Sequence, residues 1–156
     1  MASQQNYIQW NDSLTIDEGV IDDDHRYLID LSNQFIRFGN KFENAAQAKE
    51  LTNLLKDYAL AHFRREEDLQ AQIGFPDHEE HKKAHAELEE NLSKIKGIID
   101  ENAGVDLQDV SQQVSLLLRR WLLTHILKHD IEMRQYAPQI RAVSAGTVPL
   151  KEVAFL

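Results

Sequence analysis

Residues 62–85 read HFRREEDLQAQIGFPDHEEHKKAH and carry two ligand-type motifs, HxxxE at 62–66 and HxxxH at 81–85. Residues four apart on an α-helix differ by about 40° in direction, so the two side chains of each motif can reach one small volume. Gly74 and Pro76 lie between the motifs and interrupt the helical periodicity. The stretch therefore predicts two helices joined by a short turn, each bearing a pair of side chains that can bind a metal.

The same spacing of apolar residues, three and four apart, recurs in the rest of the chain. It predicts an all-α fold, in which short connections make consecutive helices antiparallel neighbours in an up-down-up-down four-helix bundle. We expect the bundle within residues 1–138, with an N-terminal arm at 1–20 that carries Trp10, and a tail or linker at 139–156. The helices are expected from after Asp22 to near Gly39, from Asn44 (capped with Gln47) to about Ile73, from Asp77 (capped with Glu80) to before Gly104, and from near Asp106 to about Tyr136.

The composition excludes several classes of protein. The net charge is -9, whereas a nucleic-acid surface needs clustered Lys and Arg. The absence of Cys excludes disulfides, thiolate zinc sites and iron–sulfur clusters, and it is compatible with a reducing cytosol. The first residues, MASQQNYIQWND, show no signal-peptide pattern, and no run of about 18 apolar residues occurs. We therefore expect a cytoplasmic protein whose partners include neither a nucleic acid nor a membrane.

Histidines lie in line with apolar residues on the inward stripe of every expected helix. A buried carboxylate such as Glu66 would lose several kcal/mol of solvation without a partner, and Arg64 and Arg65 are expected on other faces of its helix. A metal ion accepts both neutral imidazole and carboxylate as ligands and removes this cost. The stripes are Ile21, His25, Leu28, Leu31 and Phe35; Leu51, Leu55, Tyr58, His62, Glu66, Leu69 and Ile73; His81, His85, Leu88, Leu92, Ile95 and Ile99; and Val110, Val114, Leu117, Trp121 and His125.

Each of these features alone has a plainer interpretation. A single HxxxH or HxxxE is common on surfaces, a lone His25 can be a hydrogen-bonded core residue, and Phe63 and Trp121 can be core packing. What favours a metal site is the coincidence of five histidines on inward stripes with two carboxylates in register. The two other histidines, His78 and His129, are expected to be ordinary surface residues.

The last ligand pair, His125 and Asp130, has an awkward spacing. Five residues turn a regular helix by about 140°, which is too far for both side chains to face one site. Either the helix widens locally into a π-type turn, or Asp130 reaches in from the flank of the stripe. We expect the widened turn, because metal ligands can offset the backbone hydrogen bond that is lost.

In its order of motifs the sequence resembles the hemerythrins, and more closely their bacterial branch. The order is a histidine, then HxxxE, then HxxxH, then HxxxxD. It is found here as IDDDHRYL at 21–28, HFRREE at 62–67, HKKAH at 81–85 and HILKHD at 125–130. The flanks agree as well, with Trp10, Gly19 and Ile21 before the first histidine, GFP at 74–76 and WLLTHI at 121–126. The resemblance extends from Trp10 to Tyr136.

The resemblance implies a non-haem di-iron centre, in which an oxo or hydroxo group and two carboxylates bridge two iron ions. His81, His85 and His125 would hold one iron. His25 and His62 would hold the other, which keeps an open position, and Glu66 and Asp130 would bridge the pair. The apolar residues of the oxygen pocket beside the open position would be Leu28, Phe63, Trp121, Leu122 and Ile126.

The function that this resemblance implies is reversible binding of dioxygen. A carrier or store of oxygen is the first hypothesis. A sensory domain is the second, with the arm or residues 142–156 signalling to an effector domain or a docking partner. Oxidase, peroxidase or nitric-oxide chemistry at the same irons is the third. We do not expect an enzyme, because no acid–base group beyond the ligands is evident near the site.

Overall fold

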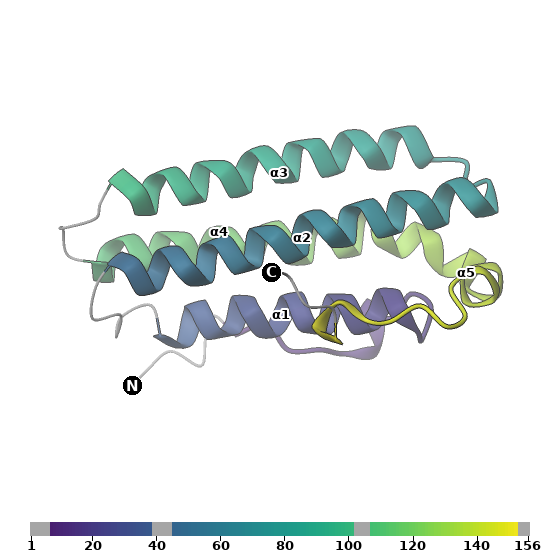
Figure 1. Ribbon diagram of the computed structural model, residues 1–156, viewed down its shortest axis with the longest axis horizontal. Helices are drawn as coiled ribbons and strands as arrows, with labels where there is room; N and C mark the ends of the chain where they lie inside the picture. The colour runs from purple at the N-terminus through teal and green to yellow at the C-terminus, as the bar shows by residue number, and fades with distance from the viewer. Residues whose placement is uncertain (1–6, 39–44, 102–106, 153–156) are drawn as a thin grey trace.

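The computed structural model describes residues 7–38, 45–101 and 107–152, and all regular elements in these ranges are helical. Four of the helices are long and lie side by side (Figure 1). Shorter helical turns precede, follow and flank them. The elements are η2 (Asp12–Leu14), α1 (Val20–Phe38), α2 (Ala45–Ile73), α3 (His78–Glu101), α4 (Leu107–Lys128), η4 (Asp130–Tyr136), α5 (Ala137–Val143) and η5 (Leu150–Glu152).

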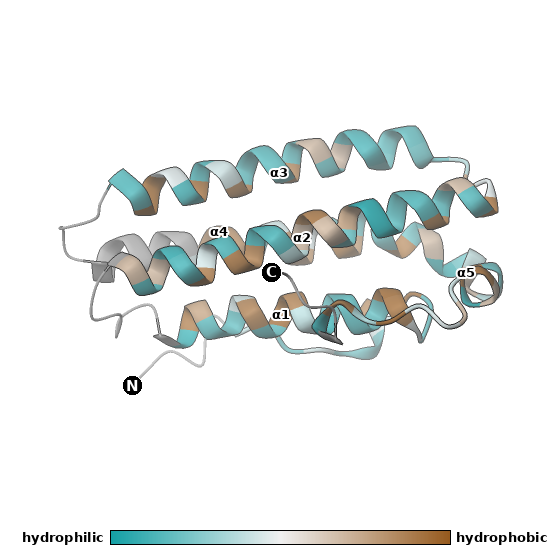
Figure 2. Ribbon diagram, viewed as in Figure 1, coloured by the Kyte–Doolittle hydropathy of each residue, from teal (hydrophilic) through white to brown (hydrophobic). Residues whose placement is uncertain are grey.

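The long helices form a closed set of neighbours, since α1 contacts α2 and α4, and α3 contacts the same two helices. Apolar residues recur along each helix among polar ones, as the alternation of brown and teal in Figure 2 shows. This is the pattern of a helix that buries one face against its neighbours. None of the described helices carries an apolar stretch long enough to cross a bilayer.

The predicted stripes of the first three helices face the core, with one error in the fourth. Leu88, Leu92, Ile95 and Ile99 of α3 are buried, as expected. On α4, however, Leu117 is 42% exposed and Leu118 is 1% exposed. Neighbouring residues on a helix differ by about 100° in direction, so the inward stripe of α4 runs through Leu118 instead of Leu117. Val110 and Val114 lie where the structure describes no side chains.

The start of α1 also differs from expectation, because Asp22 lies inside the helix and does not cap it. Asp17 serves that end: its Oδ1 accepts from the backbone N–H of Gly19 (2.9 Å) and Asp22 (3.1 Å), and its Oδ2 from that of Ile21 (3.1 Å). The Asp22 carboxylate instead turns back on the arm. Helix α1 therefore begins earlier and is fixed to the arm by two buried carboxylates.

The turn between α2 and α3 follows the sequence prediction. Gly74 has φ +67°, a left-handed conformation that Gly adopts without strain, and Phe75 N–H donates to the Gln70 carbonyl at 2.9 Å to close α2. Helix α3 begins at the residue after Asp77. The predicted Asn44 cap lies outside the described residues.

The widened turn expected between His125 and Asp130 is wrong. Helix α4 keeps its ordinary bonding as far as His129, whose N–H donates to the His125 carbonyl at 2.8 Å. The chain then tightens into the 3₁₀ helix η4, where Glu132 N–H donates to the His129 carbonyl at 3.1 Å. His129, at φ −111° and ψ −55°, makes the junction. Ending the α-helix re-aims Asp130 without a helical bulge.

The arm and the C-terminal residues both pack on the bundle. Ile8, Leu14 and Ile16 of the arm are buried, and so are Ile140 of α5 and Leu150 of η5. The yellow segment after α5 runs back along α1 in Figure 1, and η5 contacts α1 and α2. Within the segment expected to be a tail or linker, Ile140 and Leu150 thus pack into the hydrophobic clusters of the core.

Asp17→Ala should lower the free energy of unfolding by about 2 kcal/mol, because it removes the acceptor of three amides at a buried helix start. Asp17→Asn retains one oxygen and should lose less. Urea unfolding measures both. Equal stability of wild type and Asp17→Ala would contradict this assignment of the cap.

Candidate metal centre

All seven side chains that the sequence singles out as ligands converge at one place in the bundle core. Helix α1 contributes His25, α2 contributes His62 and Glu66, α3 contributes His81 and His85, α4 contributes His125, and η4 contributes Asp130. Every one of them is at least 94% buried. The four-residue spacings of HxxxE and HxxxH explain the convergence of those two pairs directly, and the tightened chain after α4 brings in Asp130.

Glu66 faces two groups of histidines, one with each carboxylate oxygen. Its Oε2 lies 2.8 Å from Nε2 of His62 and 3.2 Å from Nε2 of His25. Its Oε1 lies 3.2 Å from Nε2 of His85 and 3.4 Å from Nε2 of His81. The carboxylate therefore stands between the two groups.

Asp130 divides its oxygens in the same way. Its Oδ1 lies 2.7 Å from Nε2 of His81 and 2.9 Å from Nε2 of His125, and its Oδ2 lies 3.0 Å from Nε2 of His25. Two ligand groups result, one with His81, His85 and His125 and the other with His25 and His62. Both groups share Glu66 and Asp130, and within each group the ligand atoms lie within 4.8 Å of one another.

Several ring nitrogens and carboxylate oxygens of these ligands lie close to one another without forming a hydrogen bond. Among the described residues, the buried atoms without such a partner include Nε2 of His62, His85 and His125, Oε1 of Glu66 and Oδ2 of Asp130. Buried polar atoms are otherwise nearly always satisfied. Nitrogen and oxygen lone pairs that point at a common centre fit a cation between them, and imidazole with carboxylate is a donor set that iron and zinc accept.

The pKa values of the side chains in the site also show that the two carboxylates need positive charge beside them. Burial lowers the pKa of His25, but Asp130 and Glu66 outweigh burial and raise the pKa to about 10. The pKa of His62 rises to about 9 and that of His81 to about 10, against the same effect of burial. Burial raises the pKa values of Glu66 and Asp130, yet the histidines hold both well below the ordinary range. Without metal, protons supply the positive charge that the carboxylates require.

Comparison with known proteins agrees with this geometry. Residues 18–137 match the hemerythrin HHE cation binding domain. The chain belongs to the hemerythrin family. It is 30% identical to a bacteriohemerythrin of Stenotrophomonas maltophilia over 133 residues, which are 85% of this chain and 81% of that protein. It is 32% identical to a bacteriohemerythrin of Pseudomonas aeruginosa over 124 residues, 80% of this chain and 77% of that one. A hemerythrin-like protein of Naegleria gruberi is 26% identical over 125 residues, 80% of this chain and 89% of that one.

Membership of the hemerythrin family implies that non-haem iron occupies such a site. The same family resemblance assigned His25, His62, Glu66, His81, His85, His125 and Asp130 as ligands, and these are the residues that the structure brings together.

The far sides of several histidines in this hemerythrin domain are held by residues that the sequence analysis missed. Nδ1 of His62 lies 3.2 Å from Oδ2 of Asp24, and Nδ1 of His85 lies 3.3 Å from Oε2 of Glu67. Gln70 lies 2.9 Å from Nδ1 of His81. Of the three, only Gln70 had a signal, since it stands four residues after Glu66 on the same helix face.

Gln70 also corrects the expectation for His78. The Gln70 amide bridges His81 and His78, with Oε1 placed 3.1 Å from Nδ1 of His78. If Nε2 of His81 held a metal, its proton would lie on Nδ1, and the Gln70 amide would then present its oxygen to His81 and its NH₂ to His78, half a turn from its present orientation. His78 and His129 are both half-buried. The His129 ring centroid lies 5.3 Å from that of His125, and burial together with His125 lowers the pKa of His129.

The five residues predicted for the oxygen pocket are all buried in one hydrophobic cluster: Leu28, Phe63, Trp121, Leu122 and Ile126. The Phe63 ring stacks on His85 with centroids 4.3 Å apart. Its centroid also lies 6.4 Å from that of the His62 ring, so Phe63 lies beside both ligand groups. Phe63 therefore forms an apolar wall beside the centre.

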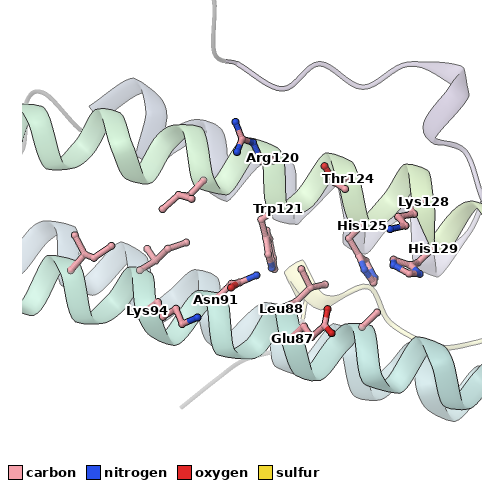
Figure 3. A pocket seen from close by; sticks show the side chains of 14 residues that line it. Glu87, Leu88, Asn91, Lys94, Arg120, Trp121, Thr124, His125, Lys128 and His129 are labelled. Atoms are coloured by element: carbon pink, nitrogen blue, oxygen red, sulfur yellow. The ribbon is translucent and has the colours of Figure 1, made fainter.

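A hollow of about 500 Å³ between α3 and α4 leads from the surface toward the same centre (Figure 3). Leu88 and Ile95 line it on α3, Trp121 and His125 line it on α4, and His129 lines it at the junction after α4. Among the seven candidate ligands, His125 is the one that lines this hollow.

Loading the site with ferrous iron at about pH 7 should release protons, because the pKa values of about 10, 9 and 10 keep His25, His62 and His81 protonated in the metal-free protein. The apparent affinity should accordingly rise with pH until these pKa values are passed. Anaerobic titration with a pH indicator in weak buffer measures the release. Magnesium, which prefers oxygen ligands, is the control and should release few protons. Iron binding without proton release would contradict the charge state described.

Proposed function

We propose that this chain binds dioxygen reversibly at a centre of two iron ions, as a carrier or store of oxygen. The observation that carries the proposal is the division of two shared carboxylates between a group of three histidines and a group of two. Each carboxylate directs one oxygen to each group, which is the arrangement needed to bridge two metals. An oxo or hydroxo group derived from solvent would complete the bridge.

The unequal groups assign different roles to the histidines. His81, His85 and His125 would fill most of the positions of one iron. His25 and His62 would leave the second iron with fewer protein ligands, and oxygen would bind there. The two irons, when bound, supply the electrons for reversible oxygen binding. The protein fixes the ligands and keeps water away with the apolar residues Leu28, Phe63, Trp121, Leu122 and Ile126.

Binding is favoured over turnover by what surrounds the ligands. The ligand set has five imidazoles and two carboxylates, whereas carboxylate-rich sites favour oxygen activation. The nearby carboxylates of Asp24 and Glu67 face Nδ1 of ligand histidines, so they are engaged away from the open position. We therefore propose a binding protein and not an enzyme.

A sensory domain is the second candidate, and one observation favours it. The residues after α5 return to the bundle, and Leu150 N–H donates to Asp24, which is bonded to His62. A partner that displaced this segment would disturb a residue next to the metal centre. We also propose that the four long helices run up, down, up and down, which the mutual contacts of α1, α2, α3 and α4 support. A cytoplasmic location is part of the proposal as well.

His62→Ala should abolish the reversible optical change that air produces in the ferrous protein, because it removes one of only two histidines on the oxygen-binding side. The measurement is the visible spectrum before air, after air and after degassing. Lys83→Gln, at an exposed position of α3, is the control and should behave as wild type. A normal, reversible spectrum in His62→Ala would refute the assignment of the open side. A wild-type spectrum that changes once and does not return would refute reversible binding.

A further inference from the structure

Asp24 is a buried carboxylate of α1 that faces Nδ1 of His62, the ring nitrogen opposite the one that faces Glu66, and it joins three parts of the chain. It is 0% exposed. Its Oδ2 lies 3.2 Å from Nδ1 of His62 and accepts from Nη1 of Arg65 at 2.9 Å. Its Oδ1 accepts from the same Arg65 nitrogen at 3.1 Å and from the backbone N–H of Leu150 at 2.8 Å. A carboxylate with this many donors is held in one orientation.

The Leu150 contact belongs to a segment that the family match does not include, since the match ends at residue 137. We call residues 144–152 the C-terminal strap. Leu150 is 2% exposed and is part of the main hydrophobic cluster. The side chain of Leu150 therefore seats the strap, and its N–H lies against Asp24.

We infer that Asp24 is a positioning residue for His62, and that the C-terminal strap holds Asp24 in place through the Leu150 N–H. The inference rests on the proposed function, in which Nε2 of His62 faces the oxygen-binding iron. A histidine that binds metal through Nε2 carries its proton on Nδ1, and an acceptor there fixes the ring and makes it a stronger donor.

His62 is the member of the two-histidine group with such an acceptor. Nδ1 of His25 has no hydrogen-bond partner among the described residues. On the three-histidine side, Gln70 is a neutral partner of His81, and Glu67, the partner of His85, is 23% exposed. Among the described contacts, the fully buried carboxylate that faces Nδ1 of a ligand histidine is Asp24, balanced by Arg65, and it acts on the oxygen-binding side. A change in the strap should alter this side more than the other.

The first test reads the Asp24–His62 bond without oxygen. In protein loaded with zinc, a diamagnetic substitute for iron, the Nδ1 proton of His62 should give a downfield resonance that exchanges slowly with water. Asp24→Asn should shift this resonance upfield and speed its exchange at least about tenfold. Asp23→Asn, at the neighbouring half-exposed position, is the matched control and should leave it unchanged. Absence of the slow proton in the wild type, or its persistence in Asp24→Asn, overturns the inference.

The second test reads the strap. Leu150→Pro removes the N–H at the first residue of η5, where Pro is tolerated, and Leu150→Ala shortens the side chain but keeps the N–H. In iron-loaded protein, Leu150→Pro should lose bound oxygen or oxidise irreversibly about tenfold faster than Leu150→Ala. In the Asp24→Asn background this difference should vanish, because the signal passes through Asp24.

Equal rates in the two Leu150 variants, or a difference that survives in the Asp24→Asn background, would refute the role of the strap. Thermal unfolding of both variants identifies any general loss of stability, which would affect them alike. If the wild-type protein fails to bind oxygen reversibly, the proposed function is wrong, and the zinc experiment still decides whether Asp24 orients His62.

Discussion

The fold of this chain is organised around two carboxylates that are buried in a helical core. Glu66 and Asp130 are 0% and 1% exposed, and each is in contact with histidines on both sides. An isolated buried carboxylate would cost several kcal/mol, so the site must hold positive charge at all times, as protons or as metal. That requirement explains why four helices and a 3₁₀ turn each direct a basic or acidic side chain to one point in an otherwise apolar interior.

The segments outside the long helices support the same ligand site. The arm is fixed to the start of α1 by Asp17 and Asp22, just before the first ligand, His25. The tightened chain after α4 turns Asp130 inward, and the C-terminal strap returns to Asp24 behind His62. Ligand geometry in a metal site depends on such supporting contacts as much as on the ligands themselves. The centre is therefore built by the whole chain, including residues after the helices end.

The helices and the pairs His62/Glu66 and His81/His85 could be predicted from the sequence because both follow from spacing along a regular helix, whereas the full ligand set came from the resemblance to hemerythrins. Each motif places its members on one face, whatever the neighbouring helices do. The end of α4 after Lys128 could not be predicted, because HILKHDIEMRQY contains no Gly or Pro. Tertiary contacts decide where this α-helix tightens into a 3₁₀ helix. The choice of Leu118 over Leu117 depends on a rotation that a local pattern leaves open. The role of Asp24 could not be predicted from the sequence, because its partner Leu150 is 126 residues away in an aperiodic segment.

We propose that Glu66 and Asp130 would each bridge two iron ions. Anomalous diffraction at the iron absorption edge, from crystals loaded anaerobically with ferrous iron, tests this most directly. We expect two iron peaks that both contact the two carboxylates, one beside His81, His85 and His125 and the other beside His25 and His62. A single iron peak within the cluster, or two peaks of which only one contacts Glu66 and Asp130, would contradict it.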